Sequence, residues 1–562
     1  MCGIGGFIAH AGNAPQKPAL AAMRDALATR GPDGNGMAVN DAVGLVHTRL
    51  SIIDLAGGAQ PIADYKGRVL VFNGEIYNYR ELRAALSGRY TFRTNSDSET
   101  ILAAYDAHGV DCVHHLRGMY AFAIYDPGAG RTLLARDPFG IKPLYLAETA
   151  AGIAFASEPK ALVAGGFAAP DIDVMRLRAV LRHNFIGGTL TPYPAIARMQ
   201  PGESRLYEHG KLVSSSIRSF LALQPARADD RAEALLELND ILCDSVDLHC
   251  RSDVGYGVFL SGGVDSSAIM AALALRGDVA QIRTYTAYFD VPGAGDERDY
   301  ARAVRESVGA QGVDVLFDAA DFDAMLPAIA AYMDDPVTDY AILPTWKLAS
   351  VAAREQKVVL SGEGGDELFA GYGRYRSRPW KDWRRWFAQD GVDLPRAWSR
   401  LQRLQARDIA GYLPCDLLVK LDTCLMAHGL EGRTPFLDER VAEFAFGLPD
   451  ALKLRGRDGK YLLRHWLDGA LPQARAFERK RGFTVPVGGW IADMARDLAD
   501  FLPRQPVLRE LLTAREMAAL TARLHTPEGA KAAWGPLYLA LWHAGKTSAA
   551  PAPSIREALA IT

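Results

Sequence analysis

Residues 258–267, which read VFLSGGVDSS, decide the fold of the C-terminal half of the chain. The first three residues are apolar and predict a β-strand, and the run from Ser266 to Leu275 predicts a helix. Two glycines join them and let the backbone approach a ligand closely. The serine hydroxyls and the first N–H groups of the helix then point at one spot, which is an anion site for a phosphate chain. A Walker A loop is excluded, because G-x-x-x-x-G-K-[ST] is absent from the sequence.

Further strand and helix patterns surround this loop. Ala232–His249 has leucine and valine at three- and four-residue spacing, which predicts a helix. Thr284–Phe289 and Val358–Leu360 predict two more strands, and a second glycine-rich turn follows the latter. Strands that alternate with helices indicate a parallel sheet with crossover helices. The chain is mostly helical from about Trp380 onward.

The N-terminal part has a different pattern, with many short strands. Val69–Phe72, Ala121–Tyr125 and Gly152–Phe155 are apolar and rich in β-forming residues, and Glu99–His108 is helix-like. Strands outnumber helices, which predicts a layered α+β domain. The polar stretch Gln224–Asp230 separates this part from the next and is interpreted as a linker.

The composition is that of an ordinary globular protein, and it excludes several functions. Hydrophobic residues make up 49% of the 562 residues, and the net charge of −3 gives no case for binding nucleic acid or an acidic membrane. None of the six cysteines forms a CxxC pair, so zinc ribbons and thioredoxin-type sites find no support. So few cysteines indicate a reducing cytoplasm. We find neither an apolar run of membrane-spanning length nor the basic start of a signal peptide.

Cys2 follows the initiator methionine and is a candidate nucleophile. Removal of Met1 would leave one residue that carries both a thiol and a free α-amine. That amine has an unperturbed pKa of about 7.7–8.0, so it can act as general base for its own thiol. A cysteine at position 2 is usually incidental, and the motifs around it therefore decide its interpretation.

Four motifs favour a catalytic role for Cys2. They are RGPD at residues 30–33, HTRLSI at 47–52, NGEIYN at 73–78 and Ser96-Asp97. Together with Cys2 they resemble the class II glutamine amidotransferases, which are N-terminal-nucleophile hydrolases with a four-layer αββα sandwich. The resemblance implies that glutamine is the substrate of this half and that Cys2 attacks its side-chain amide.

The same resemblance implies how glutamine is held. The Asn73 side chain and the Gly74 backbone N–H form the oxyanion hole. Arg49 holds the α-carboxylate of glutamine, since a guanidinium pairs with a carboxylate bidentately. Glu75 and Asp97 hold the α-ammonium. All five residues belong to the quoted motifs.

Each of these residues also has a simpler interpretation. Asn73-Gly74 is a strong type I′ hairpin turn. Residues 96–99, SDSE, form a capping box for the helix that follows. Arg49 is a surface residue. Turns and caps can coexist with a site, because sites are often built on turns.

The SGGVDSS sequence resembles the loop of the ATP pyrophosphatases. These enzymes cleave ATP between the α and β phosphates and adenylate a carboxylate or carbonyl oxygen, so the resemblance implies ATP as a substrate. The residues that it places around the pyrophosphate are Ser261, Gly262, Gly263, Asp265, Ser266 and Ser267. GMP synthetases, NAD synthetases, argininosuccinate synthetases and tRNA-sulfur enzymes share this loop, which leaves the acceptor open.

A second acidic, glycine-rich loop follows Val358–Leu360. Residues 361–372 read SGEGGDELFAGY, and they lie beyond the carboxyl end of a predicted parallel strand, where such sheets present ligands. Mg²⁺ takes carboxylate and phosphate oxygens, so Asp265 and Asp366 are the best candidate ligands. A loop of solvated acids is the simpler interpretation.

Two further motifs, LEGRTPFLD at residues 430–438 and GKYLLR at 459–464, extend the comparison. With the second loop they look like the asparagine synthetases of the glutamine-hydrolysing type, from Cys2 to about Trp490. This resemblance implies that Glu363 and Tyr372 form an acid/base pair near the acceptor. It also implies that Lys460 is the cation on the pentavalent phosphate during adenylation. It places four residues around the adenosine, namely Leu260, Ala287, Ser361 and Gly362. A solvated lysine in a turn is the simpler interpretation of Lys460.

The resemblance implies a two-domain ligase. Residues 1–215 are the expected glutaminase domain with the αββα sandwich, and residues 230–562 are the expected synthetase domain, a parallel-sheet ATP pyrophosphatase fold with a helical C-terminal part. Glutamine supplies ammonia to β-aspartyl-AMP made from ATP and aspartate, with Mg²⁺ bound. Small molecules are the expected partners, without nucleic acid or membrane, and a homodimer is compatible with the family.

The acceptor is the least defined part of this prediction. Residues 335–345 read DPVTDYAILPT where some members carry a Thr-Thr-x-Arg stretch thought to select aspartate. The same chemistry on a peptide, a sugar acid or a secondary metabolite is the alternative, and a degenerate nucleotide-binding regulator is a third hypothesis. The β-lactam-forming branch typically lacks the N-terminal cysteine, so Cys2 argues against it.

Overall fold

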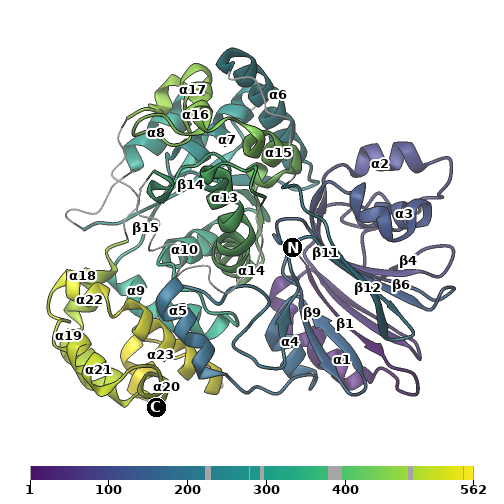
Figure 1. Cartoon of the computed structure of the whole chain (residues 1–562), viewed down its shortest axis with the longest axis horizontal. Coiled ribbons are helices and arrows are strands. Elements are labelled where there is room, and N and C mark those ends of the chain that lie inside the picture. Colours follow the sequence, from purple (N-terminus) through teal and green to yellow (C-terminus); the bar gives the residue numbers. More distant parts are fainter. Residues whose placement is uncertain are drawn as a thin grey trace.

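The computed structural model has a β-rich half formed by the N-terminal part of the chain and a helix-rich half formed by the rest (Figure 1). The end of the chain marked N lies at the boundary between the halves, whereas the C-terminal end lies among the last helices. The described residues are 2–221, 230–277, 279–291, 297–376, 395–478, 485–548 and 550–560.

Two antiparallel sheets form the β-rich half. The strands of the first are β1 Gly3–Ala9, β2 Gly34–Val39, β3 Val43–Arg49, β8 Tyr145–Thr149, β9 Gly152–Ala156 and β10 Ala197–Arg198, in the order β10-β8-β9-β1-β3-β2. Those of the second are β4 Ile62–Ala63, β5 Val69–Ile76, β6 Gly118–Asp126, β7 Arg131–Arg136, β11 Glu203–Glu208 and β12 Lys211–Ile217, in the order β12-β11-β7-β6-β5-β4.

Helices cover both outer faces of this pair of sheets. On the first sheet lie α1 Lys17–Ala26 and α4 Pro159–Ala164, and on the second lie α2 Tyr79–Leu86 and α3 Ser98–His108. Apolar side chains from both sheets, such as Val71, fill the space between them. The predicted αββα sandwich is therefore confirmed. Successive side chains along each strand point to opposite faces, so one face of each sheet lies in this inner core.

A parallel sheet lies at the centre of the other half. Its strands are β13 Tyr256–Phe259, β14 Arg283–Tyr288, β15 Gln311–Leu316, β16 Val358–Leu360 and β17 Glu431–Arg433. The order is β15-β14-β13-β16-β17, and every neighbouring pair is parallel. The chain leaves β13 in one direction and returns to β16 on its other side, so the loops after these two strands diverge. Such a switch point is where open α/β sheets bind ligands.

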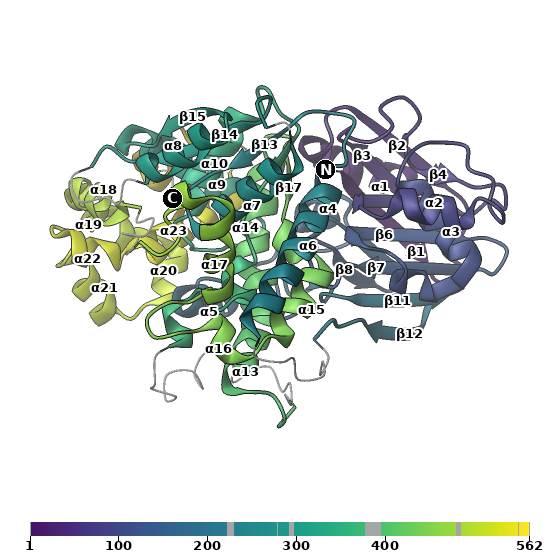
Figure 2. The same cartoon turned by 90° about the horizontal axis from the view of Figure 1, so that it is seen from above.

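Helices pack on both faces of the parallel sheet (Figure 2). One face carries α6 Arg231–His249, α7 Val264–Arg276, α8 Arg298–Ser307 and α17 Tyr461–Ala470, and the other carries α9 Ala319–Tyr332, α10 Ile342–Ala352 and α23 Trp534–Thr547. The further helices are α5 Leu177–His183, α11 Gly365–Leu368, α13 Arg400–Arg407, α14 Leu418–Met426, α15 Glu439–Gly447, α16 Asp450–Lys453, α18 Val487–Asp493, α19 Ala495–Phe501, α20 Pro506–Leu511, α21 Ala514–Thr521, α22 Pro527–Lys531 and α24 Ile555–Ala560. This arrangement confirms the predicted parallel-sheet domain with its helical C-terminal part.

Two predicted boundaries fall mostly outside the described residues. The linker Gln224–Asp230 does so apart from Asp230, whose side chain caps α6 by accepting from the Ala232 and Glu233 N–H groups. The expected start of the helical part near Trp380 also lies outside them. Every helix in the described part of the chain is too short or too polar to span a membrane.

Buried contacts join the two halves. α5 precedes β10 in the sequence, yet Leu177 and Val180 belong to the apolar core formed by the C-terminal helices. Beside it, Arg198 on β10 donates from Nε to Asp335 Oδ2 at 3.2 Å, and the Tyr145 hydroxyl donates to the same oxygen at 3.1 Å. Arg198 and Asp335 are 2% and 3% exposed, so their charges depend on each other.

The replacement Arg198→Met is expected to lower the free energy of unfolding by about 3–5 kcal/mol, because it leaves the buried Asp335 carboxylate without its cation. Urea denaturation followed by tryptophan fluorescence measures this loss. Arg440→Met is the matched control, since Arg440 pairs with Asp244 at 3.0 Å where both side chains are exposed, and its loss costs about 0–1 kcal/mol. Equal losses in the two variants would contradict the role given to Arg198.

Candidate active sites

The first candidate site lies where β1 begins, at the boundary between the halves (Figure 1). Cys2 immediately precedes β1 and is buried. Its backbone nitrogen donates to Asn73 Oδ1 at 3.1 Å, so the group that would become the α-amine after removal of Met1 is held beside β5. Burial raises the pKa of the Cys2 thiol to about 11. The thiol therefore needs a nearby base to react at neutral pH.

Asn73 and Gly74 lie in the middle of β5, so the hairpin-turn interpretation is wrong. Gly74 has a φ of +148°, and a Cβ at this position would lie 2.0 Å from the Met119 carbonyl oxygen, which only glycine avoids. Asn73 is fully buried, and its Nδ2 has no hydrogen-bond partner within the described residues. A buried donor left unpaired is costly, which favours a role toward a ligand.

Two buried carboxylates lie next to this strand. Asp97 Oδ2 accepts the Ile76 N–H at 2.9 Å, and burial raises the pKa of Asp97 to about 6. Burial also raises the pKa of Glu75, whose Oε1 lies 3.2 Å from a guanidinium nitrogen of Arg433. Both acids are placed to receive a cationic group such as the α-ammonium of an amino acid.

The structure also contradicts the simpler interpretations of residues 96–99 and of Arg49. The prediction of a capping box at residues 96–99 is wrong, because α3 has no side-chain cap at its start. Glu99 instead accepts a hydrogen bond from the Thr94 N–H at 2.8 Å. Arg49 is half-buried and donates to main-chain carbonyls of residues 53–55. Its guanidinium therefore has a fixed position at the site rather than a free surface one.

These residues surround a small cavity of about 30 Å³. The predicted residues that line it are Cys2, Arg49, Gly74, Glu75 and Asp97, while Asn73 contacts the main chain of Cys2. Glu431, on β17 of the other half, also lines the cavity and was missed by the sequence analysis. Its motif had been assigned to the synthetase half, and only the docking of the halves brings it to this cavity.

The second candidate site is a cavity of about 260 Å³ at the switch point between β13 and β16. The predicted residues that line it are Leu260, Ser261, Gly263, Asp265, Ser266, Ala287, Ser361, Gly362, Glu363 and Asp366. Gly262, Ser267, Tyr372 and Lys460 do not line it, and Ser267 is fully buried. Sequence patterns far apart in the chain thus converge on one cavity, as expected for a parallel sheet.

The glycine-rich loop after β13 is held in shape by its serines. The Ser261 and Ser266 hydroxyl oxygens lie 3.2 Å apart, and the Gly263 N–H donates to Ser261 at 3.1 Å. α7 begins without a side-chain cap, which leaves its first N–H groups available to an anion. Gly362 approaches from the β16 loop so closely that a Cβ there would lie 2.8 Å from the Asp265 Cβ. The two loops therefore form one continuous wall.

Lys460 is buried between two carboxylates of this wall. Its Nζ lies 2.5 Å from Asp265 Oδ2 and 2.7 Å from Asp366 Oδ1. Burial disfavours the charged amine, but the two carboxylates outweigh it and raise the pKa of Lys460, which stays protonated. The interpretation of Lys460 as a solvated turn residue is therefore wrong, since only 7% of it is exposed.

Glu363 and Tyr372 have separate partners in the described structure. The Tyr372 hydroxyl donates to Glu367 Oε1 at 2.6 Å, and burial raises the pKa of Glu367 to about 8. Glu363 lines the cavity, with Oε1 3.8 Å from the Lys420 amine. Lys420, on α14, was missed by the sequence analysis, because it belongs to none of the quoted motifs. The acid/base roles of Glu363 and Tyr372 stay a prediction.

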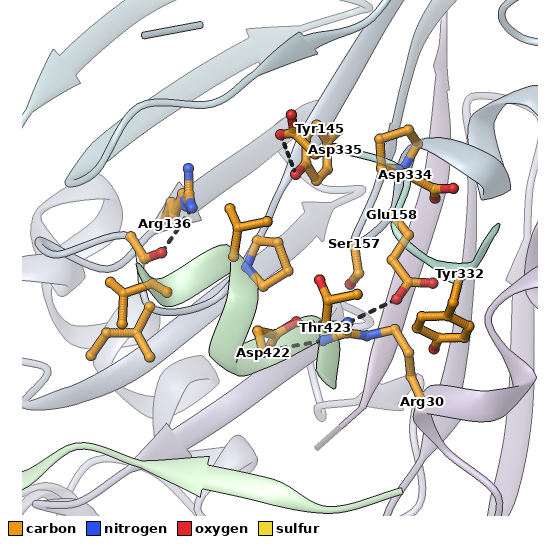
Figure 3. Close-up of a pocket in the computed structure, with 16 residues that line it drawn as sticks. Arg30, Arg136, Tyr145, Ser157, Glu158, Tyr332, Asp334, Asp335, Asp422 and Thr423 are labelled. Atoms are coloured by element: carbon orange, nitrogen blue, oxygen red, sulfur yellow. Dashed lines mark hydrogen bonds and ion pairs between the residues drawn. The ribbon is translucent and has the colours of Figure 1, made fainter. Parts of the chain in front are cut away.

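A third, water-sized cavity of about 20 Å³ lies between the halves and is shown in Figure 3. Arg30 lines it and is fully buried. Its guanidinium donates to Glu158 at 3.1 Å and to Asp422 of α14 at 2.8 Å, and Nε donates to the Cys2 carbonyl at 3.1 Å. Arg30 thus links the main chain of the nucleophile to the helix that carries Lys420.

Comparisons with known proteins match both halves. Residues 1–218 match the family model described as "Glutamine amidotransferase domain", and residues 237–544 match that described as "Asparagine synthase". A Mycobacterium tuberculosis protein, provisionally named as a glutamine-hydrolysing asparagine synthetase, is 34% identical over 99% of both chains.

Two further relatives carry the name without reservation. Glutamine-hydrolysing asparagine synthetase 1 of Bacillus subtilis is 31% identical over 87% of this chain and 88% of its own. Asparagine synthetase B of Escherichia coli is 33% identical over 86% of this chain and 82% of its own. Both family models and these full-length matches show that the chain belongs to the glutamine-hydrolysing asparagine synthetase family of carbon–nitrogen ligases.

Proposed function

We propose that the chain makes asparagine from aspartate and ATP with glutamine as the nitrogen donor, at two separate sites. The observation that carries this proposal is a cavity at the head of a parallel sheet that is lined by Asp265 and Asp366, both of which pair with the buried Lys460. The same chain holds a buried cysteine beside an unpaired amide donor. The proposed functional units are residues 1–215 and 230–562.

In the first site, Cys2 attacks the side-chain carbonyl carbon of glutamine while its own α-amine accepts the thiol proton. The Asn73 amide and the Gly74 N–H donate to the oxyanion that forms, and the free Asn73 Nδ2 supports this role. The proton passes to the leaving nitrogen and ammonia departs. Water then hydrolyses the thioester to glutamate and restores the thiol.

The same cavity offers groups for the amino-acid end of glutamine. Arg49 would bind the α-carboxylate, and Glu75 and Asp97 would bind the α-ammonium. Support comes from the charged groups of the cavity, which is lined by buried carboxylates and by one guanidinium. Glu431 adds a further carboxylate from the synthetase half.

In the second site, the β-carboxylate of aspartate attacks the α-phosphorus of ATP, so that β-aspartyl-AMP forms and pyrophosphate leaves. Lys460 is charged and buried, and it would stabilise the charge that grows on the phosphate oxygens. Ammonia then attacks the activated carbonyl carbon, asparagine forms and AMP leaves. Glu363, which lines the cavity, would take the proton from the attacking ammonia.

Asp265 and Asp366 fit a magnesium ion. Both carboxylates line the cavity and converge on one lysine amine, and Mg²⁺ takes carboxylate oxygens together with phosphate oxygens. When bound, the ion would offset the charge of the pyrophosphate. The residues proposed to surround the adenosine line the same cavity, and they are Leu260, Ala287, Ser361 and Gly362.

Ammonia would pass between the sites through the interior. The cavity beside Arg30 is lined in part by α14 and has room for a molecule the size of water (Figure 3), and Arg30 itself donates to the Cys2 carbonyl. Separation of the two sites would also protect the adenylate from water. A cytoplasmic location and a homodimer stay predictions from the sequence.

Cys2→Ala is expected to abolish glutamine-dependent asparagine synthesis and to leave ammonia-dependent synthesis within about twofold, because the nucleophile and the adenylation cavity are different sites. Asparagine formation is measured with glutamine and, separately, with an ammonium salt. An equal loss of both activities would count against two separate sites.

Asp366→Asn and Asp265→Asn are expected to remove ATP-dependent synthesis and to spare glutamine hydrolysis, because each removes a carboxylate that fits the metal. AMP formation is followed as the Mg²⁺ concentration is raised, and glutamate release serves as the folding control. A variant that makes AMP at the wild-type rate with ordinary Mg²⁺ would show that its residue is not a ligand.

Lys460→Ala is expected to leave ATP binding nearly normal and to lower the adenylation rate at least about 100-fold, because a cation aimed at growing charge helps the transition state more than the ground state. Single-turnover AMP formation at saturating ATP and aspartate measures this. Lys66→Ala, which replaces an exposed lysine of the glutaminase half, is the control. A drop of less than about tenfold would remove Lys460 from the catalytic machinery.

A further inference from the structure

The amino ends of three neighbouring strands of the parallel sheet lie next to the β-rich half. β13, β16 and β17 are adjacent, and their register aligns Tyr256 with Val358 and Val358 with Glu431. Glu431 lines the first cavity, and Tyr256 and Val358 pack in the same apolar cluster as Ile52 of the β-rich half. The loops that follow β13 and β16 line the second cavity. One sheet therefore contributes to both cavities, at its opposite ends.

Asp253, three residues before β13, holds a turn of the β-rich half through two hydrogen bonds. Its Oδ2 accepts the Asp54 N–H at 2.7 Å, and its own N–H donates to the Ile52 carbonyl at 3.0 Å. Asp54 has a φ of +49°, which aspartate adopts more readily than most residues. The Asp54 carboxylate accepts the Gly57 N–H at 2.9 Å and the Asn95 N–H at 2.8 Å. The turn of residues 52–55 is thus fixed by its own aspartate and by an acid of the other half.

The carbonyl groups of this turn hold the Arg49 guanidinium. Nη2 donates to the Asp54 carbonyl at 2.6 Å and to that of Ile53 at 3.3 Å, and Nη1 donates to that of Leu55 at 3.1 Å. Within the described part of the chain, Arg49 pairs with no carboxylate. Neutral carbonyl groups fix the direction of a guanidinium and leave its charge for another partner. Arg49 lines the first cavity, so that partner can be an anionic group of a ligand bound there.

A lysine before β16 holds the chain just ahead of this turn. Asp33 Oδ2 accepts the Ser51 N–H at 2.7 Å and lies 2.6 Å from Nζ of Lys357, which immediately precedes β16. Ser51 receives no hydrogen bond from Arg49, whereas the residue that Asp253 holds does. Two strands of the sheet thus anchor one segment of the β-rich half, and Asp253 is the more direct link to the guanidinium.

We propose that Asp253 is a positioning residue for the first site, which directs the Arg49 guanidinium toward the α-carboxylate of glutamine through the turn of residues 52–55. Asp253 contacts the turn and not the substrate. The inference rests on the proposed function, and it adds that the affinity for glutamine depends on an acid of the synthetase half. Loss of Asp253 would let the turn move and the guanidinium change direction, while Cys2 and Asn73 keep their own contacts.

The first test compares Asp253→Ala and Asp253→Asn in the full-length chain, with glutamate release as the measurement. In Asp253→Ala, KM for glutamine is expected to rise about 5- to 20-fold and kcat to stay within about twofold, because Arg49 binds a carboxylate that takes no part in the reaction. Asp253→Asn keeps an oxygen that can accept the Asp54 N–H. It is expected to hold KM within about threefold of the unmodified chain.

Matched controls separate positioning from a general loss of structure. Asp247→Ala removes another acid of the same half, which pairs with Arg276 at 2.6 Å where both side chains are exposed, and it should leave KM unchanged. Iodoacetamide alkylates thiols and carries no carboxylate, so its rate of reaction with Cys2, followed by mass spectrometry of the N-terminal peptide, should be the same in Asp253→Ala. Ammonia-dependent asparagine synthesis should also be unchanged, and it reports that the variant is folded.

Three outcomes would overturn the inference. They are an unchanged KM in Asp253→Ala, a KM raised as much by Asp253→Asn as by Asp253→Ala, and an equal loss of glutamine hydrolysis, Cys2 alkylation and ammonia-dependent synthesis. The last outcome would give Asp253 a structural role alone.

Arg49→Ala separates the failure of this inference from the failure of the proposed function. If Arg49→Ala raises KM for glutamine and Asp253→Ala does not, only the inference fails. If Arg49→Ala leaves KM unchanged, the carboxylate-binding role proposed for Arg49 fails, and the inference fails with it. If the unmodified chain releases no glutamate from glutamine, the proposed function of the first site is itself overturned.

Discussion

The pairing of one buried guanidinium with an acid from each half of the chain is the interaction on which both sites depend. Arg30 has no exposed surface, and a buried charge is costly unless it is matched inside the protein. Glu158 and Asp422 match it, while Nε of the same side chain holds the Cys2 carbonyl. Because Asp422 belongs to α14, the halves cannot separate without leaving the charge of Arg30 only partly paired. The position of the nucleophile is therefore set by the docking of the halves.

Arg433 makes a second connection between the halves, next to the first cavity. It is fully buried, lies 3.2 Å from Glu75 and 2.6 Å from Glu431, and donates to the His249 and Arg251 carbonyls. The first cavity is thus closed by β17 of the parallel sheet. Glutamine would bring its own charges next to this network, so its binding has to be compatible with the contact between the halves. The first cavity is thus formed by residues of both halves.

Local patterns predicted the elements well, because each lies in a layer with one buried face. Val69–Phe72 became the core of β5, and the VFLSGGVDSS stretch became strand, turn and helix as expected. The hairpin interpretation of Asn73 failed because pairing with β6, not local propensity, decides the backbone there. Lys420 and Glu431 could not be predicted, since each reaches its site only through contacts between segments far apart in the sequence.

The second cavity holds its charges in a form that substrates can replace. Lys460 lies between Asp265 and Asp366, so its ammonium offsets part of the charge of the two carboxylates inside the wall. In the proposed complex Lys460 would turn to the phosphate oxygens, and the two carboxylates would turn to the metal ion. Each charge then exchanges one partner for another of the same sign, and none is left buried alone. Through this exchange a cavity with many buried charges keeps them paired and is still arranged for a polyanionic substrate.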